Sequence, residues 1–452
     1  MGLTQHMLRN GKILWIDPET VFWVVSSKIN QFTKEIYKLY ENVNSTLLNM
    51  RKKYNKFNSE PLVINYEIHL TEECNMNCDY CYVPHNYRLK SNKLNILQIE
   101  KIIEKILLYA DTQKLEKITV TFHGGEPLLR QYEILQIIEK YHKEKRLKFD
   151  IQSNGTLINH NFCKEITQYG ARIGISIDGR ENEHNKYRKF RNGNGSYHKV
   201  IEGLKILKQY IKNIGAICTI HTANVSHLSE IIEHFYNLGI HSFFLNPLVP
   251  FDTNSRKLAP PLDVLISNYK KAILKQIEIN KKNHTQKIFI SNVEALLLNI
   301  LADKQPCVCY ETPCGASRSM LVISSNGDAY PCSEFIAYGH KFKLGNIFKD
   351  SIDSILSAPF SLMLRSRHVS KIQKCKECVF KYICCGNCPL SAYHVYNDFY
   401  TPPCYCEFYY EIIDFLFTLL FEYGKDIVPL LVSDEKVLRN SDQLYEMGSC
   451  IF

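Results

Sequence analysis

Three cysteines on one short segment have the spacing of ligands to an iron–sulfur cluster. Cys74, Cys78 and Cys81 are arranged as C-x3-C-x2-C, and Tyr82 directly follows the last of them. Three thiolates can hold three irons of a cubane [4Fe–4S] cluster, which leaves the fourth iron free to coordinate another molecule. The alternatives are a zinc knuckle that lacks one ligand, or buried cysteines without a metal.

A second group of cysteines lies in the C-terminal half. Of the 17 cysteines, eleven fall between residues 307 and 406. Their spacing reads C-x12-G-x4-C and then C-x2-C-x5-C-x3-C, through Cys314, Gly327, Cys332, Cys375, Cys378, Cys384 and Cys388, with Cys404 and Cys406 downstream. Clustered cysteines in a reducing compartment are more often metal ligands than disulfides. A zinc ribbon would need only four thiolates, so the pattern favours iron–sulfur clusters. By contrast, Cys163 and Cys218 stand alone and are interpreted as small buried residues.

Glycines and small polar residues follow three of the predicted strands. The first group is His123-Gly124-Gly125-Glu126-Pro127, where the glycines permit close approach to a ligand and Glu126 can accept hydrogen bonds from an ammonium group. The next two strands end at Ser153-Asn154 and at Ser176-Ile177-Asp178. These side chains can bond a ribose or a carboxylate, or they can simply form turns. Arg188 can pair with a carboxylate of a ligand or of the protein, or it can be solvated.

Alternating strand-like and helix-like segments position these residues. Short apolar runs predict strands over 62–70, 116–122, 147–152, 171–177, 215–221 and 240–246. Helical periodicity is found between and after them, over 95–110, 129–144, 159–169, 196–211, 226–238 and 262–283. Six strands, each followed by a helix, predict an α/β fold with a parallel sheet, more consistent with an open partial barrel than with a closed one. The candidate residues would then lie at the carboxyl ends of the strands, where such barrels place their chemistry.

The two ends of the chain have a different pattern. Residues 13–25 predict two strands around an Asp17-Pro18-Glu19-Thr20 turn, followed by a helix over about 28–53. This element either grips part of a substrate peptide or simply braces the barrel. Beyond the last cysteines, the apolar run 415–421 is too short to span a bilayer and predicts a core helix, followed by a loose tail ending in Cys450.

Composition narrows the function classes. The 452 residues are 45% hydrophobic and 22% charged, which is ordinary for a globular protein of two or three domains. The net charge of +9 is diffuse, so neither a nucleic acid nor a membrane is expected as a partner. The N-terminus lacks the apolar core of a signal peptide, and we predict a cytoplasmic protein.

The triad motif and the Gly-Gly-Glu-Pro segment resemble the signatures of the radical S-adenosylmethionine (SAM) superfamily. In that family the open iron chelates the methionine part of SAM, and the core is a (β/α)6 partial barrel. His123 stands where the family commonly has glutamine. The resemblance implies SAM contacts from Tyr82, His123, Gly124, Gly125, Glu126, Pro127, Ser153, Asn154, Ser176, Asp178 and Arg188.

The C-terminal cysteine pattern resembles the SPASM domain, which carries two auxiliary [4Fe–4S] clusters in many radical SAM enzymes that modify peptides or proteins. The resemblance implies that cluster I takes Cys314, Cys332, Cys388 and either Cys307 or Cys309. It implies that cluster II takes Cys375, Cys378, Cys384 and either Cys404 or Cys406. We favour Cys309 and Cys406, although spacing leaves both choices open.

These resemblances predict four parts: an N-terminal element (1–60), a radical SAM barrel (61–300), a SPASM domain (301–410) and a C-terminal helix and tail (411–452). They imply reductive cleavage of SAM to a 5′-deoxyadenosyl radical that abstracts hydrogen from an unreactive carbon. We predict a maturase that forms a thioether in a ribosomally made, cysteine-rich peptide, with a flavodoxin or ferredoxin as electron donor.

Other modifications of a peptide, such as carbon–carbon crosslinks or epimerisation, stay open, and two further alternatives concern the class of function. One is a protein modification like that of anaerobic sulfatase maturases, which have an aspartate base directly after the second SPASM cysteine, where this chain has Ser333 and Glu334. The other is a non-catalytic iron–sulfur scaffold for electron transfer.

Overall fold

The computed structural model describes residues 2–26, 38, 40–41, 61–90, 92–283, 285–302, 308–433 and 449–451. The helix predicted over 28–53 lies almost entirely outside the described residues, as does Cys307.

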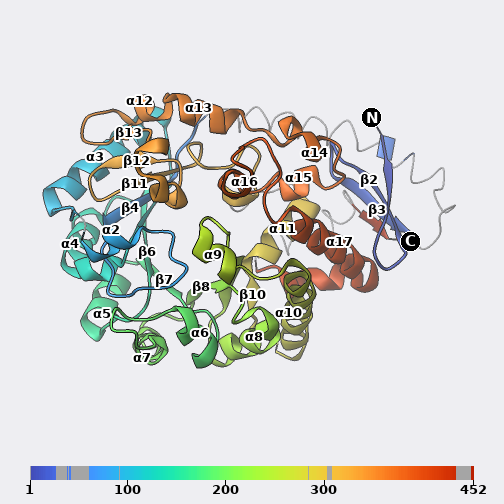
Figure 1. Cartoon of the computed structure of the whole chain (residues 1–452), viewed down its shortest axis with the longest axis horizontal. Coiled ribbons are helices and arrows are strands. Elements are labelled where there is room, and N and C mark those ends of the chain that lie inside the picture. Colours follow the sequence, from blue (N-terminus) through green and yellow to red (C-terminus); the bar gives the residue numbers. More distant parts are fainter. Residues whose placement is uncertain are drawn as a thin grey trace.

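A parallel sheet forms the centre of the molecule, as the sequence predicts (Figure 1). Seven neighbouring strands run parallel in the order β10-β9-β8-β7-β6-β5-β4. Their bounds are β4 (Asn65–Thr71), β5 (Ile118–Gly124), β6 (Leu147–Ser153), β7 (Arg172–Ser176), β8 (Gly215–Ile220), β9 (Ser242–Pro247) and β10 (Phe289–Ile290). The six predicted strands are confirmed, and the short β10 extends one edge.

Helices connect these strands and cover the outer face of the sheet (Figure 1). The connecting helices are α3 (Ile96–Gln113), α4 (Gln131–Tyr141), α5 (His160–Gln168), α7 (Tyr197–Leu207), α8 (Leu228–Asn237), α10 (Leu262–Lys282) and α11 (Ser291–Ala302). Shorter helical segments are α2 (His85–Leu89), η1 (Pro127–Arg130), α6 (Glu181–Tyr187), η2 (Val225–His227) and α9 (Thr253–Leu258). The long helices are amphipathic, and α3 begins with a capping box between Asn95 and Gln98.

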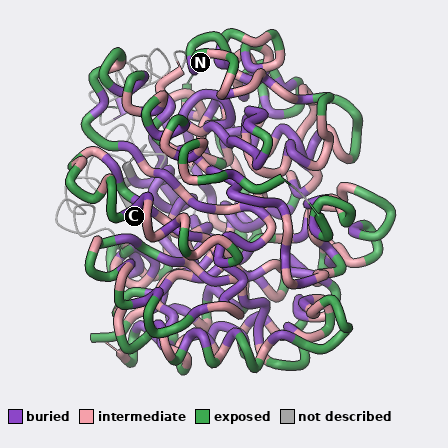
Figure 2. The backbone as a smooth tube through the Cα atoms, turned by 90° about the vertical axis from the view of Figure 1, so that its left-hand side faces the viewer, coloured by how far each residue is buried: buried purple, intermediate pink, exposed green. Residues whose placement is uncertain are grey.

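Alternation along the strands separates the core from the inner surface of the barrel. On β4, Tyr66, Ile68 and Leu70 are fully buried. The intervening Glu67 and His69 project to the opposite face, because successive strand residues alternate sides. Buried segments accordingly concentrate in the middle of the molecule, with exposed segments at its periphery (Figure 2). The inner face of the sheet is therefore free to carry polar side chains.

The cysteine-rich half adds strands to the same sheet. Strand β11 (Met320–Ile323) pairs parallel with β4, and β12 (Asp328–Tyr330) and β13 (Gly345–Asn346) follow antiparallel. Gly327 lies in the turn of the hairpin formed by β11 and β12, and it has the positive φ of +83° that this turn requires. The attachment of this hairpin to β4 was not predicted. This pairing brings the segment after β12 next to the start of the cysteine loop that leaves β4.

The rest of this half consists of short helices and one long helix, α17. They are η3 (Val308–Tyr310), η4 (Ser333–Phe342), α12 (Ile352–Leu356), α13 (Pro359–Ser366), η5 (Val369–Lys371), α14 (Gln373–Lys376), α15 (Lys381–Cys384), α16 (Pro389–Tyr396), α17 (Cys406–Tyr423), η6 (Gly424–Ile427) and α18 (Val428–Leu431). No described helix, α17 included, combines the length and apolarity needed to cross a membrane.

A separate small sheet joins the two ends of the chain, which lie at the same end of the molecule (Figure 1). Its order is β1 (Thr4–Met7), β2 (Ile13–Asp17), β3 (Phe22–Ser26) and β14 (Ser449–Ile451). The predicted β2–β3 hairpin is confirmed. The prediction of a loose tail is wrong at residues 449–451, which pair parallel with β3.

The small sheet packs on α17. The rings of Trp23 and Phe417 lie 5.1 Å apart edge to face, and Asp414 of α17 accepts hydrogen bonds from His6 and from the Arg9 amide, each at 3.1 Å. The predicted N-terminal brace therefore contacts the C-terminal helix. Its predicted role in peptide recognition remains a prediction.

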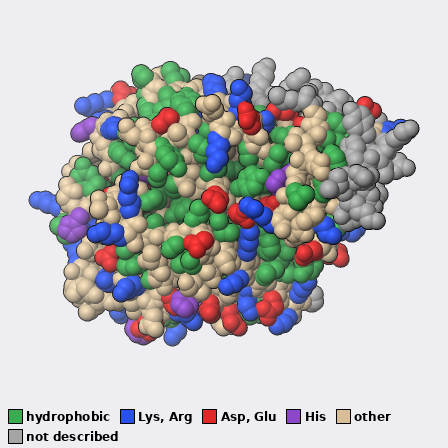
Figure 3. Space-filling view, turned by 45° about the vertical axis from the view of Figure 1, so that its right-hand side comes forward, with side chains coloured by type: hydrophobic (Ala, Val, Ile, Leu, Met, Phe, Trp, Pro, Cys, Tyr) green, Lys and Arg blue, Asp and Glu red, His purple; other side chains and the backbone are tan. Residues whose placement is uncertain are grey.

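Charged side chains are mixed on the surface. On the face shown in Figure 3, lysines and arginines are interspersed with aspartates and glutamates rather than gathered in a run.

Candidate active site

The cysteine loop is fixed from two sides. Arg88 of α2 donates to the Val83 carbonyl at 3.1 Å and to the Asn77 side chain at 2.9 Å. On the other side, the backbone amides of Asn77 and Asp79 donate to carbonyls of residues 189 and 187. The three cysteines of this loop, here called the triad (Cys74, Cys78 and Cys81), are thus held rigidly at the carboxyl end of β4.

All three triad cysteines line one cavity of about 350 Å3, here called the triad cavity. This volume is in the range of small-molecule sites. Predicted SAM contacts in its lining are Tyr82, His123, Gly124, Gly125, Ser153, Asn154, Ser176 and Arg188. Most of the SAM contacts that the sequence predicts therefore line the triad cavity.

The sulfur atoms of the triad are suited to binding iron. Burial raises the pKa of Cys74 to about 12 and that of Cys78 to about 11, so a metal must displace their protons when it binds. The sulfur of Cys74 accepts hydrogen bonds from the Met76 amide at 3.4 Å and from Asn154 at 3.8 Å. Such N–H···S bonds adjust the potentials of iron–sulfur clusters, and the donor set fits a [4Fe–4S] site.

The two glycines line the cavity and also permit the close approach of two loops. A Cβ atom on Gly124 would lie 2.2 Å from the Thr71 carbonyl oxygen. One on Gly125 would lie 2.2 Å from the carbonyl oxygens of both Glu72 and Glu73. The loops are joined there by a hydrogen bond of 3.0 Å from the Gly125 amide to the Thr71 carbonyl. The glycines thereby set the position of the cysteine loop.

Glu126 lies behind the cavity wall, where the sequence suggested a contact to the ammonium group of SAM. It is fully buried, and its carboxylate accepts hydrogen bonds from the Leu128 amide at 3.0 Å, the Ser153 hydroxyl at 2.8 Å and the Asn154 amide at 2.7 Å. Burial raises its pKa. Glu126 therefore ties the ends of β5 and β6 together, and the neighbouring Pro127 is buried beside it at the start of η1.

Asp178 and Arg188 form a buried charge network. Asp178 is fully buried, accepts a hydrogen bond from the Tyr80 hydroxyl, and lies 4.0 Å from Arg188 and 3.6 Å from His221. Burial alone would raise the pKa of Asp178, but Arg188 and His221 outweigh it and hold the pKa at about 2. Arg188 is 8% exposed and donates to Tyr80 at 2.8 Å, so the alternative of a solvated arginine is wrong.

The opposite wall of the triad cavity comes from the C-terminal half. It includes Ser333, Glu334 and Ala337 of η4 and His394 of α16, and Phe251 from the barrel loop after β9 also lines the cavity. Burial, followed by the nearby Glu67 carboxylate, raises the pKa of Glu334. Sequence reasoning weighed Glu334 only as a replacement base and missed the others, because only the β4–β11 pairing brings η4 to this cavity.

Polar residues on the inner face of β4 were also missed. Glu67 accepts a hydrogen bond from the Ser333 hydroxyl, and the His69 ring stacks on His123 with centroids 5.3 Å apart. The signal that could have found Glu67 and His69 is their spacing of two in an otherwise apolar strand.

The predicted cysteines of cluster I are brought together in part. Cys314, Cys332 and Cys388 influence one another electrostatically, and burial raises the pKa of Cys332 and Cys388. Cys309 is exposed on η3, next to Val308, whose carbonyl accepts hydrogen bonds from the Gly315 amide at 2.9 Å and the Cys314 thiol at 3.8 Å. Its role as fourth ligand remains a prediction.

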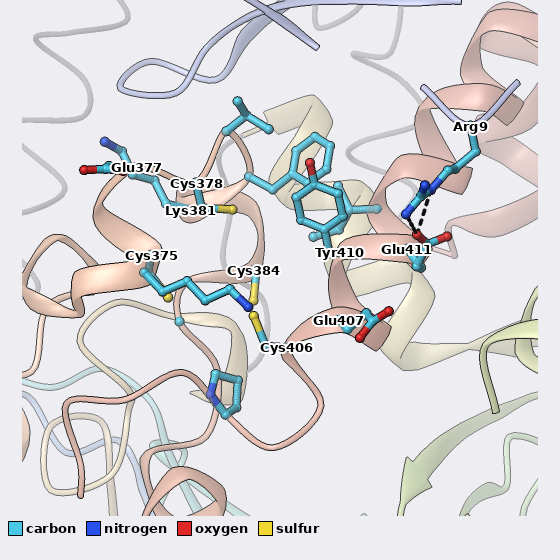
Figure 4. A pocket seen from close by; sticks show the side chains of 16 residues that line it. Arg9, Cys375, Glu377, Cys378, Lys381, Cys384, Cys406, Glu407, Tyr410 and Glu411 are labelled. Atoms are coloured by element: carbon cyan, nitrogen blue, oxygen red, sulfur yellow. Dashed lines mark hydrogen bonds and ion pairs between the residues drawn. The ribbon is translucent and has the colours of Figure 1, made fainter. Parts of the chain in front are cut away.

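The predicted cysteines of cluster II surround a second cavity of about 420 Å3 (Figure 4). Cys375 belongs to α14, Cys378 to the following loop, Cys384 to α15, and Cys406 begins α17. Cys404 points elsewhere, with Ser391 and Glu334 as its neighbours. The geometry thus favours Cys406 over Cys404. Cys385, which directly follows Cys384, is not among the residues that line this cavity, and its thiol donates to the Tyr382 carbonyl at 3.4 Å.

Comparisons with known families agree with this geometry. The radical SAM superfamily matches residues 68–235, and SPASM, an iron–sulfur cluster-binding domain, matches residues 314–379. An uncharacterized protein of Archaeoglobus fulgidus is 30% identical over 404 residues, covering 89% of this chain and 91% of that protein. A serine-type anaerobic sulfatase-maturating enzyme of Bacteroides thetaiotaomicron is 26% identical over 348 residues, covering 71% and 81%.

Two solved structures have a similar fold. Native anSMEcpe with bound AdoMet and Cp18Cys peptide has a TM-score of 0.70 at 21% identity, covering 80% of this chain and 99% of that one. Streptococcus suis SuiB bound to precursor peptide SuiA has a TM-score of 0.60 at 17% identity, covering 85% and 84%. The chain therefore belongs to the radical SAM superfamily, as an enzyme that carries a SPASM domain and uses SAM and [4Fe–4S] clusters as cofactors.

Proposed function

We propose that this chain is a peptide maturase that forms a thioether crosslink in a ribosomally made, cysteine-rich precursor peptide. The observation that carries the proposal is the construction of the triad cavity. One wall holds the cysteine triad, and the other begins at Ser333, directly after the predicted cluster I ligand Cys332. A peptide side chain in this cavity would lie between the SAM site and an auxiliary cluster.

The proposed reaction must remove protons and electrons from the substrate, and groups at the two walls of the cavity can accept them. Joining a substrate carbon to a cysteine sulfur removes one hydrogen from each, so beyond the abstracted hydrogen one proton and one electron must leave. When bound, SAM with its reduced cluster supplies the 5′-deoxyadenosyl radical, and the auxiliary clusters supply an electron acceptor. In the chain itself, Glu334 and His394 are the proton-accepting side chains on the C-terminal wall.

The chain's own residues position the substrate and exclude water. Leu248, Val249 and Phe251 add apolar surface to the cavity between its two polar walls. Such a lining shields a reactive intermediate from solvent. Two proteins of similar fold were solved with peptides, which supports a peptide substrate, and a flavodoxin or ferredoxin would deliver the reducing electron.

A second candidate is the modification of a serine or cysteine in a sulfatase. Relatives of this chain carry the names of serine-type and cysteine-type anaerobic sulfatase-maturating enzymes. The observation that favours it is the position of Glu334, which lines the triad cavity where a proton acceptor is needed. Its carboxylate follows Cys332 by two residues rather than directly.

The two candidates are separated by product chemistry. The reconstituted, reduced enzyme is incubated with SAM and with peptides encoded by short cysteine-rich reading frames near its gene, or with a sulfatase-derived peptide. Thioether formation yields a peptide lighter by a pair of hydrogen atoms that no longer reacts with thiol reagents. A matched peptide with serine in place of the cysteine should remain unchanged. An aldehyde on the sulfatase peptide, with cysteine-rich peptides unmodified, would instead establish the second candidate.

A further inference from the structure

Arg367 is a buried cation between the two groups of auxiliary cysteines. It follows α13 and is 2% exposed. Its guanidinium donates to backbone carbonyls of Gly386 at 3.3 Å, Asn387 at 3.3 Å and Thr401 at 3.2 Å, and also to the carbonyl of Phe399. All these acceptors are neutral. Within the described part of the chain, no carboxylate lies at ion-pair distance from this guanidinium.

The electrostatic neighbours of Arg367 are cysteines that are assigned to both predicted clusters. Cys314 and Cys388 of cluster I and Cys375 and Cys384 of cluster II are its electrostatic neighbours. Burial lowers the pKa of Arg367, and these four sulfurs oppose that effect. A guanidinium remains protonated in proteins, so the buried charge has to be compensated by negative groups near it.

Arg367 also holds the segment that links the two clusters. Cys384 and Cys388 are ligands of different predicted clusters, and only residues 385–387 separate them. All three of these residues have positive φ, at 60°, 69° and 41°. Two of them are not glycine, so this tight turn is strained. The turn is stabilised by the hydrogen bonds from Arg367 to carbonyls within it.

We propose that Arg367 is a shared counter-ion of the two auxiliary clusters and raises the reduction potential of both. A thiolate-ligated [4Fe–4S] cluster carries net negative charge, and reduction adds one more negative charge. A fixed cation nearby favours the reduced state, because net charge and hydrogen bonding set cluster potentials. Arg367 itself gains and loses neither an electron nor a proton. The inference rests on the auxiliary clusters of the proposed function but is independent of the bond that the enzyme forms.

Two substitutions separate charge from structural support. Arg367→Gln keeps hydrogen-bond donors but removes the charge, whereas Arg367→Lys keeps the charge but loses the forked donors. Arg365→Gln is the matched control, because Arg365 lies in the last turn of α13, two residues before Arg367, donates to the Leu356 carbonyl at 3.0 Å and has no cysteine among its electrostatic neighbours.

The measurement is an EPR-monitored redox titration of the full-length chain, reconstituted in a background where all three triad cysteines are alanine. Only the auxiliary clusters then contribute, and no turnover is required. Iron and sulfide per chain are measured first. We expect Arg367→Gln to lower the reduction potential of both clusters, with Arg367→Lys close to the parent and Arg365→Gln unchanged.

Each outcome decides the proposal. Unchanged potentials in a fully iron-loaded Arg367→Gln protein, a shift of one cluster alone, or equal shifts in the Gln and Lys variants would overturn it. If the Gln variant fails to hold iron while the Lys variant holds it, the charge is required and the proposal stands. If both fail to hold iron, Arg367 is only a structural support and the proposal is wrong.

Discussion

The triad site and the auxiliary sites differ in how the chain brings their cysteines together. The three triad ligands lie within eight residues on one loop, whereas the four predicted ligands of cluster II come from α14, a loop, α15 and the start of α17. Around the triad, Arg188 has both the Cys78 sulfur and the Asp178 carboxylate as electrostatic neighbours, with the carboxylate 4.0 Å away. Around the auxiliary cysteines, Arg367 has carbonyls and sulfurs as partners and, among the described residues, no carboxylate at ion-pair distance. The buried arginine of the first site is therefore partly compensated by a carboxylate, whereas that of the second is not.

The largest expected difference concerns SAM cleavage. Cys78→Ala removes a ligand of the SAM-binding cluster and should reduce 5′-deoxyadenosine formation to background. Cys378→Ala should lose cluster II but still cleave SAM, because the triad cavity does not include it. The amount of 5′-deoxyadenosine is measured by chromatography after anaerobic assays with dithionite as the reductant. Undiminished cleavage in Cys78→Ala would contradict the assignment of the triad, and Cys385→Ala serves as the non-ligand control.

The next difference concerns which cysteine completes cluster II. Cys406→Ala should lower iron from about twelve to about eight per chain, since one cluster of four irons is lost. Cys404→Ala should retain about twelve irons, because its sulfur lies outside the cluster II cavity. Iron and acid-labile sulfide analysis after reconstitution measures both variants. The reverse result would exchange the two assignments.

A smaller loss, of SAM affinity, is expected when a side chain is added at the point where two loops meet beside the triad. Gly125→Ala places a Cβ 2.2 Å from two carbonyl oxygens and should displace the cysteine loop. We expect SAM affinity to fall about tenfold, since overpacking costs about 1–3 kcal/mol. Gly215→Ala is the control, because Gly215, like Gly125, has no positive φ and its Cβ would make only an ordinary contact of 3.8 Å. Equilibrium dialysis with labelled SAM measures the affinity, and equal losses in the two variants would refute the steric explanation.

The smallest expected difference is in the free energy of unfolding when either of two glutamates is replaced. Glu126→Gln replaces a buried carboxylate that accepts three hydrogen bonds and should lower the free energy of unfolding by about 2 kcal/mol. The exposed Glu377, which lines the cluster II cavity, should change it by less than about 0.5 kcal/mol when replaced by Gln. Urea unfolding followed by circular dichroism measures both. A stable Glu126→Gln protein with weakened SAM binding would restore the predicted ligand contact.

Local sequence information was sufficient for much of the barrel. The period of two in the strands and the helical period between them predicted all six strands and their helices. The order along the chain predicted that the cysteine loop and the segments after β5, β6 and β7 meet at one edge. Roles within that edge were less predictable. The contact of Glu126 with a ligand stays a prediction, whereas its hydrogen bonds to Ser153 and Asn154 were not predicted, because only folding brings these donors to it.

By itself, the sequence determined the cysteine spacing, the strand and helix periods, and therefore the family and the location of the triad. These properties depend on residues that are close along the chain. The tertiary structure alone showed that β11 joins the edge of β4, that Glu334 lines the triad cavity, that Cys406 lines the same cavity as Cys384, and that Arg367 has cysteines of both predicted clusters as electrostatic neighbours. Each of these contacts joins segments far apart in sequence, and such pairings follow from the packing of the whole chain rather than from any local pattern.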